Sequence, residues 1–382
     1  MKKRVLFMMD SLTCGGAEKS LVSLLPLLDY DKIDVTLMLV ERGGLFECYV
    51  PKQVKVVTLP QPTGLRMKWA SIRCSLQLRF NKIFGKKEHG AETIWKYIGN
   101  AFPALKDSYD YAFAYQQGFP TYYIANKVHA IKKYSWVNVD MMKAGYNVNF
   151  NAVVYDKYTN IIGVSDAVHI DLVNQGYVSD ASKVITIYDI LNPQLIRKMS
   201  QESGFDDNFK GIRLVTVGRM TPQKSYDLAV LAAEELRKRG YKFRWSFVGD
   251  GISRSLIEKM IAERNLEGYI ELLGEQANPY PYMAACDVYV QTSSFEGFGL
   301  TVTEARILGK AEVCTNFPSA YNQITDGETG LICEMNPKAV ADKIELLFTN
   351  VDLKAKLEGN VAKEVNKTAE TESAKVRALM EA

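Results

Sequence analysis

The feature of this sequence that most restricts its fold is an alternation of strand-like and helix-like segments along its 382 residues. Short apolar runs such as 4–9, 109–115, 212–217 and 287–291 have the length and composition of buried strands. Segments with apolar residues at helical spacing separate these runs. Alternating strands and helices form parallel sheets, so the sequence predicts an α/β protein with doubly wound sheets.

The length of the chain indicates two domains. Residues 189–211 contain proline, glycine, serine and a charged cluster with little periodicity, which favours a linker. The predicted organisation is an N-terminal domain over 1–190, a linker over 191–211, a C-terminal domain over 212–366 and a last helix over 367–382.

Two carboxylates follow the predicted strand at 287–291. A polar turn with two glycines leads into a predicted helix over 300–308, which places Glu296 in the turn and Glu304 in the helix. Ligands of doubly wound sheets bind at this strand end, and the N–H groups of a helix start favour an anion. A nucleotide-sugar, with hydroxyls at both ends and a diphosphate between them, suits this arrangement. The alternative is a pair of solvated glutamates.

Two cations follow the predicted strand at 212–217. Gly218 precedes Arg219, and Lys224 comes five residues later across the same turn. Arg offers a planar fork and Lys a mobile point charge, so together they suit a diphosphate. Solvated side chains are the alternative.

The stretch Ser293 to Ala305, Ser-Ser-Phe-Glu-Gly-Phe-Gly-Leu-Thr-Val-Thr-Glu-Ala, resembles the signature of retaining glycosyltransferases of the GT-B fold, family 4, also called glycosyl transferase group 1. The resemblance covers most of the chain and is most specific between Val217 and Cys333. It implies two Rossmann-like domains that face a cleft and a C-terminal helix that crosses back to the first domain. It also implies a nucleotide-sugar donor held mainly by the second domain, with no obligatory metal and no other cofactor.

The resemblance implies roles for the matching residues. Arg219 and Lys224 would stabilise the charge on the leaving diphosphate. Glu296 would bind sugar hydroxyls and orient the anomeric carbon, and Glu304 would hold the ribose. The other expected donor-binding positions are Gly15, Gly16, Gly218, Gly274, Phe298, Gly299, Leu300 and Thr301.

The Gly15-Gly16 turn follows the first predicted strand and opens a helix, so it would let a ligand approach the backbone closely. It lacks the third glycine of a dinucleotide fingerprint. A plain helix start is the alternative, and the absent fingerprint argues against a dehydrogenase.

One position departs from the family pattern. The run 136–140, Trp-Val-Asn-Val-Asp, has Asn138 where the family has a His near the anomeric region of the sugar. An Asn amide can hydrogen-bond a sugar hydroxyl, but it does not titrate near neutral pH. In the family's retaining mechanism, a donor phosphate oxygen takes the acceptor proton, so activity does not require a His here.

The segment 65–87 has a basic amphipathic pattern. Six apolar residues recur at spacings of three and four, seven Lys and Arg lie among them, and no acidic residue occurs before Glu88. The apolar positions are Leu65, Trp69, Ile72, Leu76, Phe80 and Ile83; the basic ones are Arg66, Lys68, Arg73, Arg79, Lys82, Lys86 and Lys87. The pattern suits a helix that lies on an anionic membrane, and equally a helix whose apolar face packs on the core.

The charge distribution and the cysteines indicate the kind of partner and the cellular compartment. Residues 1–195 carry 23 Lys and Arg against 17 Asp and Glu, whereas the remainder carries 24 against 27. The basic first half suggests an anionic partner, with ordinary surface charge as the alternative. Six scattered cysteines without a C-x-x-C pair favour the cytoplasm and argue against a zinc site. The basic, then apolar, N-terminus is expected to be a strand and not a signal peptide.

Together with these observations, the resemblance implies a retaining, metal-independent hexosyltransferase that uses a nucleotide-sugar, expected to be a UDP-sugar. The expected acceptor is a glycan or lipid-linked glycan of surface polysaccharide assembly, and the expected location is the cytoplasm, peripheral to the membrane. No nucleic-acid partner is predicted. The alternatives are a weakly active or non-catalytic nucleotide-sugar-binding partner and, less favoured, a sugar-nucleotide epimerase.

Overall fold

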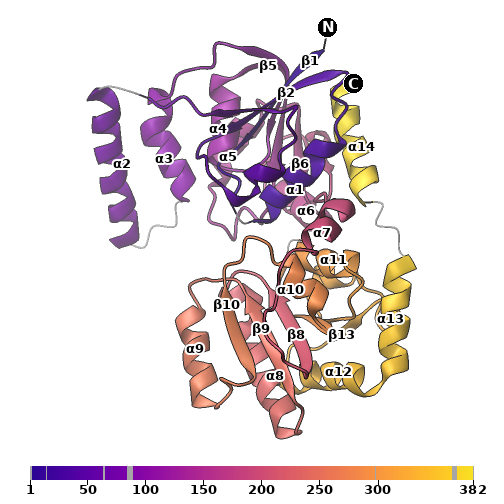
Figure 1. The fold of residues 1–382 in the computed structure, drawn as a ribbon. Coiled ribbons are helices and arrows are strands. Elements are labelled where there is room, and N and C mark those ends of the chain that lie inside the picture. The colour runs from indigo at the N-terminus through magenta and orange to yellow at the C-terminus, as the bar shows by residue number, and fades with distance from the viewer. Residues whose placement is uncertain are drawn as a thin grey trace. The chain divides into compact units, whose positions relative to one another are not determined.

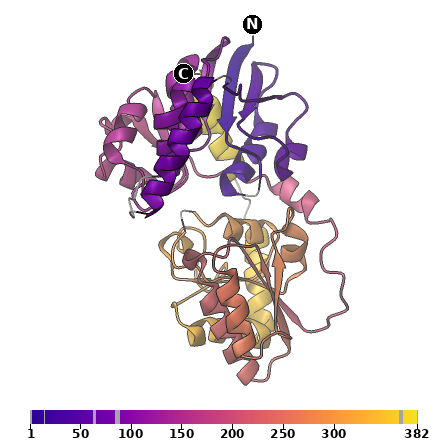
Figure 2. The same ribbon diagram turned by 90° about the vertical axis from the view of Figure 1, so that its left-hand side faces the viewer.

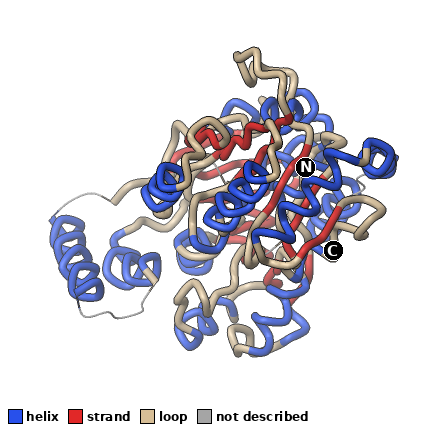
Figure 3. The backbone as a smooth tube through the Cα atoms, turned by 90° about the horizontal axis from the view of Figure 1, so that it is seen from below, coloured by secondary structure: helices blue, strands red, loops and turns tan. Residues whose placement is uncertain are grey.

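The structure is a computed structural model that describes residues 2–13, 15–62, 65–83, 89–296, 298–363 and 368–381. The chain divides into two compact units, and each is described by itself. Unit 1 comprises residues 1–190 and 368–382, and unit 2 comprises residues 191–367. Figure 1 shows both units as α/β folds, and Figure 3 shows helices around the strands.

Unit 1 is built on a parallel seven-stranded sheet in the order β3-β2-β1-β4-β5-β6-β7. The first strand therefore lies between the second and the fourth, and Val5 pairs with both Val35 and Tyr111. The strands are β1 (Lys3–Met9), β2 (Ile33–Leu39), β3 (Lys55–Thr58), β4 (Ser108–Ala114), β5 (His129–Val137), β6 (Asn160–Gly163) and β7 (Val184–Thr186).

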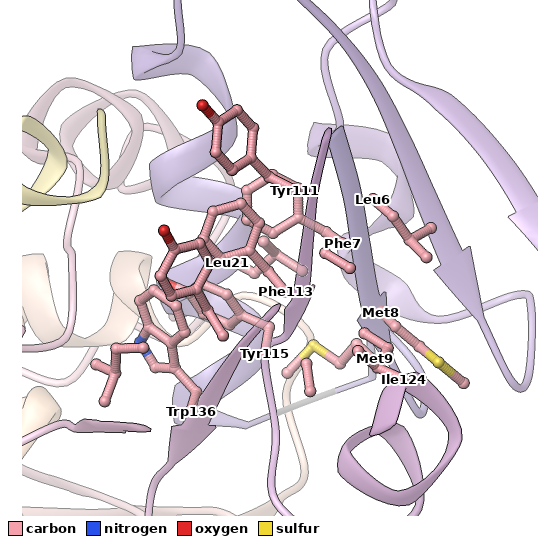
Figure 4. Close-up of a cluster of buried hydrophobic side chains, with 14 of the residues drawn as sticks. Leu6, Phe7, Met8, Met9, Leu21, Tyr111, Phe113, Tyr115, Ile124 and Trp136 are labelled. Atoms are coloured by element: carbon pink, nitrogen blue, oxygen red, sulfur yellow. The ribbon is translucent and has the colours of Figure 1, made fainter. Parts of the chain in front are cut away.

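The centre of unit 1 is apolar and strongly aromatic because its middle strands are covered on both faces. Phe7 stacks on Phe113 at 4.7 Å, and Tyr115 stacks on Trp136 at the same centroid distance (Figure 4). The α-helices of this unit are α1 (Gly16–Leu24), α2 (Leu65–Ile83), α3 (Gly90–Ile98), α4 (Phe119–Lys127), α5 (Val148–Tyr155), α6 (Asp166–Asn174) and α14 (Thr368–Glu381).

The C-terminal helix α14 belongs to unit 1, in agreement with the expected return of the last helix to the first domain. The hydroxyl of Tyr134 donates to the carbonyl of Leu379 at 2.7 Å, and the backbone N–H of Tyr188 donates to the Glu372 carboxylate at 2.9 Å. Val376 is fully buried in the core of unit 1. The helix is therefore held by apolar packing and by hydrogen bonds to two strand regions.

Unit 2 contains a parallel six-stranded sheet in the order β10-β9-β8-β11-β12-β13. The strands are β8 (Ile212–Val217), β9 (Phe243–Val248), β10 (Ile270–Gly274), β11 (Val288–Gln291), β12 (Glu312–Thr315) and β13 (Leu331–Cys333). The α-helices are α7 (Pro193–Met199), α8 (Tyr226–Lys238), α9 (Arg254–Glu263), α10 (Tyr280–Ala285), α11 (Leu300–Ile307), α12 (Pro337–Thr349) and α13 (Val351–Lys363). Both sheets are thus doubly wound, as predicted.

The segment predicted as a linker over 191–211 contains α7, which the Asn192 side chain caps by accepting from the N–H groups of Gln194 and Leu195. Glu312 lies in β12, which pairs with strands on both sides, and it is fully buried. Capping and sheet order depend on which segments meet, so neither was visible in the local pattern.

None of the described helices is long and apolar enough to cross a membrane.

Candidate functional site

The candidate site of unit 2 lies where the carboxyl ends of β8 and β11 come together. These strands are neighbours although the chain visits β9 and β10 between them, so the strand order reverses at this point. The loops that follow the two strands run in opposite directions, so a space for a ligand opens between them at the strand ends. The loop after β8 carries Arg219 and Lys224, and the loop after β11 carries Glu296.

A buried carboxylate is the centre of this site. Oε1 of Glu296 accepts hydrogen bonds from Lys224 Nζ at 2.5 Å, Ser293 Oγ at 2.5 Å and Gln291 Nε2 at 3.1 Å. The side chain of Glu296 is 7% exposed and that of Lys224 is 18% exposed. A carboxylate with three donors on one oxygen is held in a single orientation. The structure therefore joins two of the residues that the sequence predicted, Lys224 and Glu296.

The orientation of Glu296 depends on a polar network that sequence reasoning missed. Oε1 of Gln291 accepts hydrogen bonds from the hydroxyls of Tyr289 at 2.6 Å and Thr301 at 3.2 Å. The Nε2 of Gln291 also donates to the hydroxyl of Ser293 at 2.7 Å. Gln291 is 1% exposed. A glutamine at the end of an otherwise apolar strand is the signal that points to this network, because a buried amide requires partners.

Lys224 is positioned by contacts between the two loops. The N–H of Ser294 donates to the carbonyl of Gln223 at 2.8 Å, and the Thr292 hydroxyl donates to the carbonyl of Lys224 at 3.1 Å. A Cβ on Gly218 would lie 3.4 Å from Cε of Lys224, an ordinary van der Waals distance, so the lysine stem runs beside this glycine. The sequence predicted the cations and the glycine, but not these contacts.

Arg219 has a different environment from Lys224. Its side chain is exposed, and no described residue forms an ion pair or hydrogen bond with its guanidinium. The loop that carries it packs tightly on its neighbour, since a Cβ on Gly249 would lie 2.0 Å from the carbonyl oxygen of Gly218. The N–H of Gly249 donates to Gly274 at 2.7 Å, and Gly274 has a φ of +69° that favours glycine.

The turn before α11 offers backbone donors. Gly299 precedes the helix with a φ of +86°, and the Gln323 side chain donates to the carbonyl of Phe298. Leu300 and Thr301 are the first two residues of α11, where backbone N–H groups have no intrahelical acceptor and favour an anion. Gly297 of this turn lies outside the described residues.

Glu304 is fully buried, and its Oε1 accepts from the hydroxyl of Tyr280 at 2.9 Å. The predicted contact of Glu304 with the ribose stays a prediction. Tyr280 was not singled out from the sequence, because its position opposite Glu304 depends on the packing of α10.

The predicted residues of unit 1 also lie at the carboxyl edge of their sheet. The backbone N–H of Asn138 donates to Gln117 Oε1 at 3.0 Å, and its Nδ2 donates to the same oxygen at 3.3 Å. Oδ1 of Asn138 is buried and has no hydrogen-bond partner among the described residues. Gly15 precedes α1 and Gly16 begins it; a Cβ on Gly15 would collide with the Glu18 carboxylate. Cys14 of this turn lies outside the described residues.

An acidic group near α1 was missed entirely. Burial raises the pKa of Asp10 to about 6, with help from the charges of Glu18 and Glu41. Burial likewise raises the pKa of Asp189 to about 7, with the charge of Glu18 adding to the effect and the Ser20 hydroxyl opposing it. These residues come from distant parts of the chain, so no local spacing marks them.

Two further features bear on ligands. In the part of the chain that the structure describes, no three His, Cys, Asp or Glu side chains are grouped so as to hold a metal ion. Metal independence of the reaction stays a prediction. A cavity of about 750 Å³ lies at the opposite edge of the unit 1 sheet, between the starts of β1 and β2 and the end of α14, and no predicted site residue lines it.

Comparison with known proteins matches a family model to unit 2 and one relative to most of the chain. Residues 198–364, most of unit 2, match the family model described as Glycosyl transferases group 1. Across 334 residues the chain is 26% identical to the N-acetylgalactosamine-N,N'-diacetylbacillosaminyl-diphospho-undecaprenol 4-alpha-N-acetylgalactosaminyltransferase of Campylobacter jejuni. The aligned region covers 85% of this chain and 84% of that protein. The chain is 27% identical over 223 residues to the poly(ribitol-phosphate) alpha-N-acetylglucosaminyltransferase of Staphylococcus aureus, but covers only 42% of that relative.

The fold resembles that of solved structures at low sequence identity. The structure of Anabaena HepE in complex with UDP and glucose aligns with a TM-score of 0.72 at 19% identity and 99% coverage of both chains. The structure of TarM aligns with a TM-score of 0.69 at 16% identity, over 99% of this chain and 98% of that one. These similarities show the fold.

Proposed function

Because the family match and the relatives support a glycosyltransferase of group 1 with the GT-B fold, we propose that this chain transfers a hexosyl group from a UDP-sugar with retention of configuration. The observation that carries the proposal is the buried Lys224–Glu296 pair at the reversal of strand order in unit 2. It places a cation and an oriented carboxylate at the strand end where a diphosphate and a sugar are expected.

The proposed roles follow from charge and geometry. Arg219, exposed and without a protein partner among the described residues, is available to a diphosphate and would bind it with Lys224. As the glycosidic bond breaks, negative charge grows on the leaving diphosphate, and fixed cations stabilise that charge more than they stabilise the ground state. The N–H groups of Leu300 and Thr301 would add hydrogen bonds to it.

Glu296 is proposed to bind sugar hydroxyls and to orient the anomeric carbon. One of its oxygens already has three donors, which fixes the carboxylate while the second oxygen is left to a hydroxyl. The acceptor proton would pass to a donor phosphate oxygen, so no enzymic base is required. No metal or other cofactor takes part in this proposal.

The acceptor is proposed to be a glycan or a lipid-linked glycan in surface polysaccharide assembly. The Campylobacter relative is named for a diphospho-undecaprenol substrate, and the Staphylococcus relative for poly(ribitol-phosphate). Both substrates carry phosphate, in agreement with the basic first half of this chain. We propose a cytoplasmic protein that is peripheral to an anionic membrane and contacts it through residues 65–87.

A non-catalytic nucleotide-sugar-binding partner is the second candidate. It is favoured by Asn138, which stands where the family has His and is held by Gln117 in an orientation that leaves Oδ1 without a hydrogen bond among the described residues. Such a protein would bind the nucleotide but would neither transfer the sugar nor hydrolyse the donor.

Thermal unfolding with UDP, GDP, ADP, CMP and NAD tests the donor site. A ligand at a hundred times its Kd stabilises the folded state by about 2.7 kcal/mol, and we expect this effect from UDP. Arg219→Ala should weaken it without lowering the melting temperature of the free protein, because the arginine has no described partner to lose. Lys242→Ala, at another exposed cation of unit 2, is the matched control.

The outcomes separate the candidates. A shift with UDP that Arg219→Ala reduces supports the donor site, and donor hydrolysis or transfer in the same preparation then distinguishes the enzyme from the binding partner. A shift with GDP alone would replace the UDP-sugar by a GDP-sugar. A shift with NAD alone, or with none of the five, would overturn the proposal.

A further inference from the structure

A cavity at the amino edge of the unit 1 sheet has no part in the proposed reaction. Its volume of about 750 Å³ is within the range of about 300–1,000 Å³ that is usual for ligand pockets. The starts of β1 and β2, the chain just before β2, Tyr111 of β4 and the last turn of α14 line it. Figures 1 and 2 show the start of β1 and the end of α14 on the same side of unit 1. Because the strands are parallel, this edge is opposite the one where Gly15 and Asn138 lie.

The buried part of the cavity is apolar. Leu28, Ile33, Tyr111 and Met380 line it, and each is only 6–7% exposed. Leu27 is partly buried and packs against the same core. These side chains favour an apolar group, because its burial removes apolar surface from water. The hydroxyls of a sugar or a nucleotide would lack hydrogen-bond partners at this wall, which is costly.

The solvent side of the cavity is charged. Its charged lining residues are Lys3, Asp29, Lys32, Arg377 and Glu381. The side chains of Lys3 and Lys32 are 57% and 71% exposed, so they lie toward solvent. Lys32 pairs with Asp29 at 3.3 Å, and Lys3 pairs with Asp110 at 3.7 Å. The two lysines thus have carboxylate partners, whereas Arg377 has none among the residues that the structure describes.

Arg377 is held in place through one nitrogen of its guanidinium. Its Nη1 donates to the carbonyl of Leu27 at 3.0 Å and to the hydroxyl of Ser373 at 3.1 Å. No described residue accepts a hydrogen bond from its Nε or Nη2. These two nitrogens form one edge of the planar group, whose N–H donors match two oxygens of a carboxylate or a phosphate. The cavity therefore combines an apolar wall with an anchored cation that has donors to spare.

We propose that this cavity binds an amphipathic anion, an apolar chain that ends in a carboxylate or a phosphate. Two oxygens of the anion accept from Nε and Nη2 of Arg377, and the chain lies against Leu28, Ile33 and Met380. A cationic ligand would be repelled by Arg377. A fatty acid and an isoprenyl phosphate share the proposed chemistry. The site does not depend on the donor site of unit 2, so either can fail without the other.

Isothermal titration calorimetry of the full chain tests this site, with decanoate and farnesyl phosphate as probes. Inorganic phosphate lacks the chain, and decanol lacks the charge. We expect saturable binding of one molecule per chain for at least one of the two probes, and binding at least about tenfold weaker for phosphate and decanol. Preference for decanoate would identify the ligand as a carboxylate, and preference for farnesyl phosphate would identify it as a phosphate; either result supports the proposal.

Variants separate the charge from the apolar wall. Arg377→Gln and Arg377→Lys should each weaken binding about tenfold, because neither keeps the guanidinium edge. Glu381→Gln should strengthen binding about twofold, because it removes an exposed negative charge from the lining. Leu27→Trp should weaken binding by filling the cavity while the arginine is kept. Lys52→Gln, at an exposed lysine of unit 1 that does not line the cavity, is the matched control.

The melting temperature of each free variant shows whether it folds, and Leu27→Trp keeps the test decisive if the Arg377 variants do not. The bound probe should slow amide hydrogen exchange in α14 and in residues 27–33, whereas UDP should leave both unchanged. Three outcomes would overturn the proposal: no saturable binding of either probe, phosphate that binds as tightly as farnesyl phosphate, or an equal loss of binding in Lys52→Gln. Losses confined to the cavity variants would support it.

Discussion

At the scale of single residues, the site of unit 2 is organised by Glu296 and the donors around it. Lys224, Gln291 and Ser293 all reach the same carboxylate oxygen. A buried polar group is costly unless it is paired and hydrogen-bonded, so each of these neighbours helps to hold the carboxylate in one orientation.

Substitution of Lys224 should separate its effect on catalysis from its effect on stability. We expect Lys224→Ala to lower the turnover number by two or more orders of magnitude, because about 3 kcal/mol of transition-state stabilisation is lost at the diphosphate. Steady-state kinetics with the UDP-sugar measures the effect, and the melting temperature reports the structural loss. Lys259→Ala, at an exposed lysine of unit 2, should be unchanged. Normal turnover in folded Lys224→Ala would contradict the assigned role.

Asp189 predicts a dependence of stability on pH. Its pKa is raised from 3.8 to about 7 in the folded protein, so the folded state holds a proton that the unfolded chain has released. The free energy of unfolding therefore falls as pH rises from about 4 to 7, and remains lower above that range. The ionised form is disfavoured by at most about 4 kcal/mol in the folded state.

Asp189→Asn should remove this part of the dependence. We expect the variant to be more stable than the parent at pH 8 and the difference to shrink towards pH 4, as measured by denaturant unfolding. Some dependence should remain, because the pKa of Asp10 is also raised, to about 6. A variant that is less stable than the parent at pH 8 would show that the carboxylate is better stabilised than burial beside Glu18 indicates.

At the scale of elements, α14 is tied to the strand region that ends the first part of unit 1. Glu372 is 3% exposed, accepts the N–H of Tyr188 at 2.9 Å and is bridged by Lys375. Lys375 also lies over the Tyr188 ring at 5.5 Å. A single carboxylate thus connects a C-terminal helix to a segment more than a hundred residues earlier in the chain.

Substitution of Glu372 tests this connection. Glu372→Ala leaves the Tyr188 N–H without its acceptor and should lower the free energy of unfolding by about 1–3 kcal/mol. Glu372→Gln keeps an acceptor and should cost less. The midpoint of denaturant unfolding is the measurement, with Glu370→Ala, an exposed carboxylate of the same helix, as the control. Equal effects of Glu372→Ala and Glu370→Ala would contradict a structural role for the contact.

At the scale of the whole molecule, the division into two units predicts where ligand binding is felt. The residues proposed to bind the nucleotide belong to loops of unit 2, whereas the predicted Asn138, Gly15 and Gly16 belong to unit 1. We expect UDP to slow amide hydrogen exchange in the loops 218–224 and 292–301. Exchange in α14 should not change, because its contacts lie within unit 1.

Hydrogen exchange of the full chain with and without saturating UDP, read by mass spectrometry, tests this expectation. Addition of NAD is the control, since the sequence lacks a dinucleotide fingerprint. Protection confined to peptides of unit 1 would move the nucleotide site away from the β8 and β11 loops. Protection at 292–301 that is lost in Arg219→Ala would connect the two loops to one ligand.

Much of this protein follows from its sequence. Apolar runs and helical periodicity predict the strands and helices of two doubly wound sheets, because these periods are properties of consecutive residues. The ends of strands are visible in the same way, so Gly218, Lys224 and Glu296 could be assigned to loops at the carboxyl edge of a sheet. The last helix was predicted for the same reason.

The tertiary structure decided which side chains meet. Lys224 and Glu296 are 72 residues apart, and the position of Tyr280 over Glu304 depends on how two helices pack. Periodicity showed that α2 has an apolar face, but only its neighbour α3 determines that Trp69 and Leu76 point to solvent. The tertiary structure also brings together Asp10, Glu18 and Asp189, which are distant along the chain. Local sequence specifies backbone preference and polarity, whereas pairing and burial arise from contacts between segments that are distant along the chain.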